Sequence, residues 1–151
     1  MTLNSTLIAV TDMARSLAFY QQVLGLEVEN DFGANVTLSG GLALQTLESW
    51  QDFLEGAQVR FGGNAGELYF EADDLEPLLE RLRLGNVPLV HPLKEHRWGQ
   101  RVVRFFDPDG HIIEVGEGLD AVIQRFAAQG LTPEQIARRM DVSLEFVNAR
   151  L

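Results

Sequence analysis

Apolar residues in the first third of the chain change their spacing several times. A short apolar run at residues 7–10 predicts a strand, because it is too short for a helix. Thr11 and Asp12 then predict the start of a helix whose apolar residues recur at helical spacing, namely Leu17, Phe19, Tyr20, Val23 and Leu24. Gly25 predicts the end of that helix. Alternating residues and a Ser39-Gly40-Gly41 turn signal predict three further strands, at residues 26–29, 35–38 and 42–47.

The same order of elements is predicted again in the second half of the chain. Residues 67–71 predict a strand, Asp73 and Asp74 a helix start, and Gly85 the helix end, 60 residues after Gly25. Three more strands are predicted at residues 87–90, 101–106 and 111–115, with Asp107-Pro108-Asp109-Gly110 as the last turn. One repeat alone would leave a face of its sheet bare. The duplication therefore predicts an α+β fold in which two βαβββ repeats form a curved mixed sheet around a pocket.

The segment between the repeats, residues 48–65, predicts a loop with one helical turn. Its aromatic residues Trp50, Phe53 and Phe61 fit two interpretations. The loop either lies over the mouth of the pocket, or is a crossover that its aromatic side chains attach to the core. The sequence favours neither.

Charge divides the 151-residue chain into a body and a tail. Residues 1–118 contain 18 acidic and 8 basic residues and carry the whole net charge of −10, whereas residues 119–151 contain 4 of each. The tail pattern predicts three short helices, with Thr132-Pro133-Glu134 as a capped helix start. We therefore expect a double βαβββ domain at residues 1–118 and a helical extension at residues 119–151.

Composition excludes several classes of protein. The chain has no cysteine, which excludes disulfides, thiolate metal sites and cysteine nucleophiles. It has no apolar run long enough to cross a membrane and no basic, apolar leader, so we expect a cytoplasmic protein without membrane contact. The net charge of −10 argues against nucleic-acid binding and favours a cationic ligand, although acidic charge also simply aids solubility.

Two sets of motifs resemble a known superfamily. The first set is Val10-Thr11-Asp12, Ser16-Leu17-Ala18-Phe19-Tyr20 and Val23-Leu24-Gly25. The second set is Trp98-Gly99-Gln100-Arg101 and Phe106-Asp107-Pro108-Asp109-Gly110-His111-Ile112-Ile113-Glu114. Over roughly residues 5–117 the chain resembles the vicinal oxygen chelate superfamily, which includes glyoxalase I, bleomycin-resistance proteins, fosfomycin-resistance enzymes and extradiol dioxygenases. The resemblance implies the two-repeat fold, a small-molecule ligand and a homodimer.

The resemblance also implies metal ligands on the first and last strand of each repeat. Ser5 and Glu67 fall at the first-strand positions, and Gln45 and Glu114 at the last-strand positions. Gln45, Glu67 and Glu114 would form an oxygen-donor set for Mg²⁺, Mn²⁺ or Ni²⁺, with Ser5 or water in the fourth place. Neither first-strand position carries histidine, a departure that argues against fosfomycin-transferase and dioxygenase chemistry. Alternatively, Glu67 and Glu114 hydrogen-bond arginine and tyrosine side chains without a metal.

Further candidates for chemistry lie near the second motif. Glu114 and His96 are candidates for proton transfer. Trp98 could stack on a flat ligand, and Arg101 could bind an anionic group bidentately, through two parallel hydrogen bonds. Tyr69 or its neighbour should face the cavity, because side chains alternate along a strand. The competing interpretation of His96 is a solvated loop histidine.

Three functions remain open from the sequence. A metal-dependent lyase or isomerase of the glyoxalase I type is one, and a protein that sequesters its ligand, as bleomycin-resistance proteins do, is another. The third is a ligand-sensing regulator, because residues 130–143 resemble a helix-turn-helix of resolvase-type regulators. The predicted recognition helix contains Arg150 as its single base, which argues against DNA binding. The tail would then pack on the body or on a partner through Phe126, Ile136 and Phe146.

Overall fold

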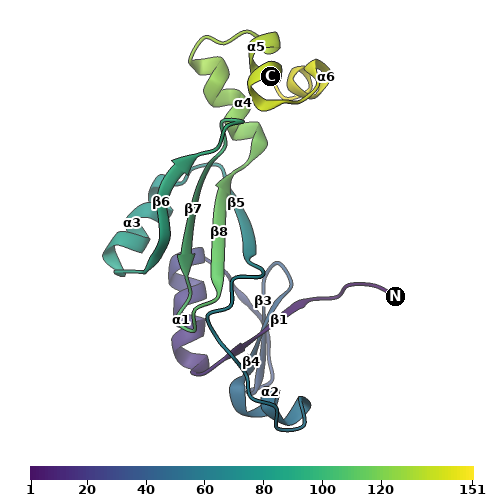
Figure 1. The fold of residues 1–151 in the computed structure, drawn as a ribbon, viewed down its shortest axis with the longest axis vertical. Coiled ribbons are helices and arrows are strands. Elements are labelled where there is room, and N and C mark those ends of the chain that lie inside the picture. Colours follow the sequence, from purple (N-terminus) through teal and green to yellow (C-terminus); the bar gives the residue numbers. More distant parts are fainter. The chain divides into compact units, whose positions relative to one another are not determined.

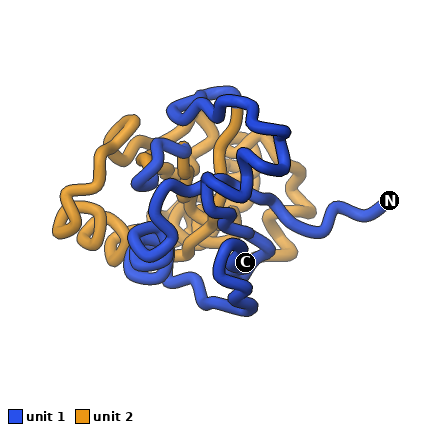
Figure 2. The backbone as a smooth tube through the Cα atoms, turned by 90° about the horizontal axis from the view of Figure 1, so that it is seen from below, with its two compact units in different colours: residues 1–65, 107–111 blue, residues 66–106, 112–151 orange.

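The computed structural model describes all residues from 1 to 151, and the chain divides into two compact units (Figure 2). Unit 1 consists of Met1–Ala65 and Asp107–His111, and unit 2 consists of Gly66–Phe106 and Ile112–Leu151. Each unit contains one four-stranded mixed sheet. The predicted α+β fold with two βαβββ repeats and C-terminal helices is confirmed. A pocket shared by the two repeats stays a prediction.

Unit 1 is the first βαβββ repeat. Its elements are β1 (Thr6–Val10), α1 (Met13–Leu24), β2 (Val28–Asp31), β3 (Asn35–Leu38), β4 (Leu42–Thr46) and α2 (Leu47–Phe53). The strand order is β1-β4-β3-β2, with β1 parallel to β4 and the other pairs antiparallel. Helix α2, with 7 residues, is longer than the single helical turn predicted after β4. Its N-cap residue Thr46 ends the strand directly before it.

The ends of α1 follow the sequence signals. The Asp12 side chain accepts a hydrogen bond from the backbone N–H of Arg15 at 3.0 Å, which satisfies a donor at the start of the helix. Gly25 ends the helix in the left-handed conformation, at φ 72°. Three side chains of α1 are buried, namely Ser16, Tyr20 and Val23.

Unit 2 contains the second repeat. Its elements are β5 (Leu68–Ala72), α3 (Glu76–Leu84), β6 (Leu89–Glu95), β7 (Arg101–Phe106) and β8 (Ile112–Glu117). The strand order is β5-β8-β7-β6, with β5 parallel to β8 and the other pairs antiparallel. Figure 1 shows α3 beside this sheet. No helix of the chain is long and apolar enough to cross a membrane.

Strand β6 differs from the sequence prediction of residues 87–90. It extends to Glu95 because it pairs with β7 as far as Arg101, through register shifts on either side of His91. Proline lacks a backbone donor, so a strand with Pro92 is tolerated only at a sheet edge or a bulge, and β6 is the edge strand. The extension places His91 on a strand and not in a loop.

The two faces of the unit 2 sheet differ in character. Val103, Phe105, Ile113 and Val115 share one face, where all four are buried. Positions one residue away point to the opposite face. We call that second face the polar face; on it, or at its border, lie Glu67, Tyr69, Glu71, His91, Arg104 and Glu114. Polar side chains in the middle of a sheet need hydrogen-bond partners, so the polar face is the candidate functional site.

The tail forms three helices, α4 (Leu119–Ala128), α5 (Pro133–Met140) and α6 (Leu144–Asn148). They share a hydrophobic cluster of buried residues, namely Val122, Ile123, Phe126, Ile136, Ala137, Met140 and Val147. Thr132 and Gln135 form a reciprocal capping box at the start of α5. Figure 1 shows the three helices together, in yellow-green and yellow. The domain boundary at residue 118 stays a prediction.

Candidate functional site

Arg104 lies at the centre of the polar face, on the inner strand β7. Its Nε donates to Glu67 Oε2 at 2.8 Å, and its second terminal nitrogen donates to Glu67 Oε1 at 3.3 Å. That same terminal nitrogen also forms an ion pair with Glu114 Oε2. Only 7% of the Glu114 side chain and 24% of the Arg104 side chain are exposed. One guanidinium therefore joins two carboxylates from neighbouring strands, Glu67 directly before β5 and Glu114 on β8.

His91 completes the surroundings of this guanidinium. Its Nε2 lies 3.3 Å from the remaining terminal nitrogen of Arg104, its register partner on β7. Its Nδ1 lies 2.8 Å from the carbonyl oxygen of Pro92. Because a carbonyl oxygen only accepts hydrogen bonds, this contact places a proton on Nδ1. In the neutral imidazole the Nε2 lone pair is then directed at Arg104.

A second polar network crosses the same face. The Tyr69 hydroxyl donates to Glu71 Oε1 at 2.9 Å and accepts from Gln100 Nε2 at 3.1 Å. Gln100 in turn accepts from Trp98 Nε1 at 3.1 Å. Gly116 makes the approach possible, because a Cβ there would lie 3.0 Å from Gln100 Nε2 and 3.2 Å from the Tyr69 hydroxyl. Tyr69 is 49% exposed and Trp98 40% exposed, so part of each ring is accessible to a ligand.

His96 lies in the turn between β6 and β7 and stacks on Trp98. The ring centroids are 4.3 Å apart and the planes meet at 19°. Partial burial lowers the pKa of His96, and the positive charges of Lys94 and Arg104 lower it further. His96 is therefore neutral near pH 7 and able to accept a proton, as its candidate role requires.

Arg101 lies on the opposite sheet face from Arg104, three residues away on the same strand. Its guanidinium donates twice to Glu117 Oε1, at 2.9 and 2.6 Å. Arg125 donates to both oxygens of the same carboxylate. Burial alone would raise the pKa of Glu117, but hydrogen bonds from Arg101 and Arg125 lower it. Arg101 is thus engaged within the protein, and its predicted contact with substrate stays a prediction.

Gln45 lies in unit 1, on β4. It is buried and accepts a hydrogen bond from Asn35 Nδ2 at 2.8 Å. Its amide nitrogen donates to Ser49 Oγ at the start of α2. Of the predicted metal ligands, the structure brings Glu67 and Glu114 to one guanidinium, whereas Gln45 has partners of its own. Its place in a common site with the two glutamates stays a prediction.

The residues around Arg104 do not fit a divalent metal in their present arrangement. The guanidinium stands between the two carboxylates that were predicted as ligands, and it carries a permanent positive charge. A divalent cation beside it would be repelled at short range. No three histidine, aspartate or glutamate side chains elsewhere in the chain are arranged to hold a metal ion.

Sequence reasoning missed three residues of this face: His91, Gln100 and Arg104. The alternation of side chains along a strand could have identified Arg104, because Arg104 and Arg101 must point to opposite faces of β7. The register with β8 then decides which arginine shares a face with Glu114. That register joins residues distant in sequence, so the motif alone favoured Arg101.

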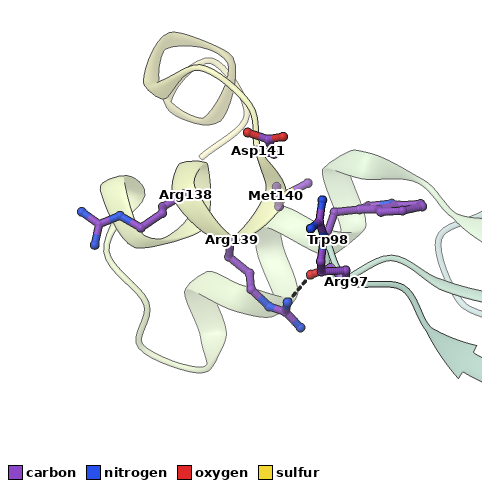
Figure 3. A pocket seen from close by; sticks show the side chains of 6 residues that line it. All are labelled: Arg97, Trp98, Arg138, Arg139, Met140 and Asp141. Carbon is purple, nitrogen blue, oxygen red and sulfur yellow. Dashed lines mark hydrogen bonds between the residues drawn. The ribbon is translucent and has the colours of Figure 1, made fainter.

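A separate pocket of about 570 Å³ lies between the β6–β7 turn and α5 (Figure 3). Its lining residues are Arg97, Trp98, Arg138, Arg139, Met140 and Asp141. Arg139 donates to the carbonyl oxygen of Arg97 and pairs with Glu95 at 2.9 Å. The indole of Trp98 extends away from Arg138 in Figure 3. These contacts attach the tail to the hairpin.

Comparison with known proteins agrees with this architecture. Residues 3–120 match the model of a family described as "Glyoxalase-like domain". The chain is 30% identical over 129 residues to a lactoylglutathione lyase of Salmonella typhimurium, covering 80% of this chain and 96% of the relative. It is 25% identical over 122 residues to the glutathione transferase FosA of Serratia marcescens, covering 78% and 81%. A protein of unknown function from Agrobacterium tumefaciens, of known structure, is 38% identical with a TM-score of 0.71, over 78% of this chain and 94% of that one.

Proposed function

Because this chain belongs to the glyoxalase-like domain family, we propose that it binds a small organic molecule on the polar face of unit 2 without a resident metal ion. The observation that carries the proposal is the position of the Arg104 guanidinium between Glu67 and Glu114. An internal cation there neutralises part of the carboxylate charge without metal. This proposal corresponds to the second function left open by the sequence, a protein that sequesters its ligand.

The exposed aromatic rings of Tyr69 and Trp98, together with the carboxylate of Glu71, favour a planar cation as ligand. Tyr69 and Trp98 present aromatic rings, whose faces attract cations. Glu71 adds a carboxylate beside the Tyr69 ring, and the whole chain carries a net charge of −10. A cation would be attracted over distance by this charge and then bound by ring stacking.

The second candidate is a lyase or isomerase, which the Salmonella relative favours by its name. In that case Glu114 or His96 would transfer a proton, and Arg104 would stabilise an oxyanion that forms beside it. The lowered pKa of His96 keeps its imidazole neutral at pH 7, the form that can accept a proton. The predicted metal, Mg²⁺, Mn²⁺ or Ni²⁺, belongs to this candidate and not to the first, and a homodimer is part of both.

A fluorescence titration with ethidium, a planar aromatic cation, tests the first candidate. We expect binding that is unchanged by excess EDTA and weakened about tenfold in Trp98→Ala, because a stacked ring contributes roughly 1–3 kcal/mol. Trp50→Ala, in α2 of unit 1, is the matched aromatic control. The second candidate is tested with lactoylglutathione under added Ni²⁺ or Mn²⁺. Turnover abolished by EDTA, without EDTA-resistant ethidium binding, would contradict our proposal.

A further inference from the structure

Three side chains of unit 2 direct acceptor atoms at one guanidinium, each to a different nitrogen. Glu67 accepts from Nε of Arg104 at 2.8 Å. The Nε2 atom of His91 lies 3.3 Å from one terminal nitrogen, and Glu114 pairs with the other. Glu67 directly precedes the edge strand β5, and His91 lies on the other edge strand, β6. Glu114 and Arg104 lie on the two inner strands, β8 and β7. The guanidinium is thus enclosed by two carboxylates and one imidazole.

We propose that Arg104 fills a latent divalent-metal site formed by Glu67, His91 and Glu114, and that its side chain keeps metal out. The inference rests on the proposed function in one respect, the absence of a resident metal. It adds His91 as a ligand, a residue that is not among the metal-ligand positions implied by the family resemblance. It also assigns a role to Arg104: its guanidinium is a fixed cation that takes the place of an exchangeable metal ion.

The chemistry of the three acceptors matches transition metals. Carboxylate oxygens and a neutral imidazole nitrogen are ordinary ligands of Zn²⁺, Mn²⁺ and Ni²⁺. The carbonyl of Pro92 holds the Nδ1 proton of His91, which is the outer contact that metal-binding histidines usually make. The three acceptors are now spread around a guanidinium and are not arranged to hold a metal directly. Removal of that group would leave the three acceptors around the space that the guanidinium now fills.

Charge explains why the wild-type protein excludes metal and a variant would not. The guanidinium of an arginine is a permanent cation that is attached to the chain and cannot exchange with solvent. Without it, the nearly buried carboxylate of Glu114 would face Glu67 with no cation between them. Two such carboxylates repel each other, and a divalent cation would remove the repulsion.

The test is a calorimetric titration of Arg104→Ala and Arg104→Gln with Zn²⁺ and Mn²⁺. We expect one equivalent to bind each variant about 100-fold more tightly than wild type, and His91→Ala in the Arg104→Ala background to lose most of this gain. Arg101→Ala is the matched control, because it removes the same charge from the same strand on the opposite face. Thermal unfolding gives a second readout, since Zn²⁺ should raise the Tm of both Arg104 variants and not that of Arg101→Ala.

The outcomes separate this inference from the proposed function. If neither Arg104 variant binds metal better than Arg101→Ala, the latent site is wrong, although EDTA-resistant ethidium binding by wild type would leave the function intact. If wild type itself binds one equivalent through Glu67 and Glu114, the latent site and the absence of a resident metal are both wrong.

Discussion

The Tyr20 hydroxyl donates a hydrogen bond to Asp107 Oδ2 at 2.8 Å, which connects α1 to the turn before β8 within unit 1. Both side chains are buried. Burial and the negative charge of Asp107 raise the pKa of Tyr20 well above its ordinary value, so the phenol remains a donor at every pH of interest. Asp107 also accepts from the backbone N–H groups of Asp109 and His111. The carboxylate therefore orders the whole Asp-Pro-Asp-Gly turn.

Tyr20→Phe should lower the free energy of unfolding by about 1–2 kcal/mol, because it removes a buried hydrogen bond to a charged group. Urea unfolding at pH 7 measures the change. Tyr69→Phe is the matched control, since it removes the same hydroxyl from a half-exposed ring, and should cost less than about 0.5 kcal/mol. Equal losses in the two variants would contradict the role assigned to the Tyr20 contact.

Protonation of Asp107 in acid should lower the free energy of unfolding. Burial alone would raise the pKa of Asp107, but hydrogen bonds and charge from His111, with a smaller contribution from Tyr20, outweigh burial and lower it. A carboxyl whose folded pKa is lowered stabilises the protein above its unfolded pKa of about 4, and this stability is lost as pH falls through the folded pKa. The stability difference between wild type and Asp107→Asn should therefore shrink from pH 7 to pH 3. Parallel pH profiles from urea unfolding would show that Asp107 contributes nothing to acid sensitivity.

Gly99→Ala should destabilise the tail. A Cβ at this position would overlap the buried Phe126 ring, and the backbone has φ +94°. The overlap should cost about 1–3 kcal/mol, because a buried ring in the tail cluster cannot move away freely. Gly63→Ala, with open space around it, is the control. Thermal unfolding of the two variants is the measurement, and an unchanged Tm in Gly99→Ala would show that the ring moves at little cost.

His96 protonation should be visible in tryptophan fluorescence. The imidazole stacks on Trp98, and a protonated imidazole in contact with an indole quenches its emission. Because the pKa of His96 is lowered, the quenching midpoint should lie below about 6.5. The titration is best done in Trp50→Phe, which leaves Trp98 as the single tryptophan. His96→Gln should remove the transition, and a midpoint above 6.5 would contradict the electrostatic surroundings described for the turn.

The sequence alone determined the order of the elements, the duplicated βαβββ plan and the family. These properties depend on local signals, such as alternation in strands, the Asp12 cap and the Gly25 helix end, which act between neighbouring residues. The matched family confirms the resemblance to the vicinal oxygen chelate superfamily. Local signals also predicted the three tail helices and the capped start of α5 at Thr132.

Only the tertiary structure decided the chemistry of the polar face. Glu67, His91, Arg104 and Glu114 come from distant parts of the chain, and the strand order β5-β8-β7-β6 brings them together. Pairing between β7 and β8 placed Arg104, and not Arg101, on the face of Glu114. A shift of one residue would have exchanged the two arginines, because side chains alternate along a strand. Register between distant strands is a non-local property, and no motif within either strand specifies it.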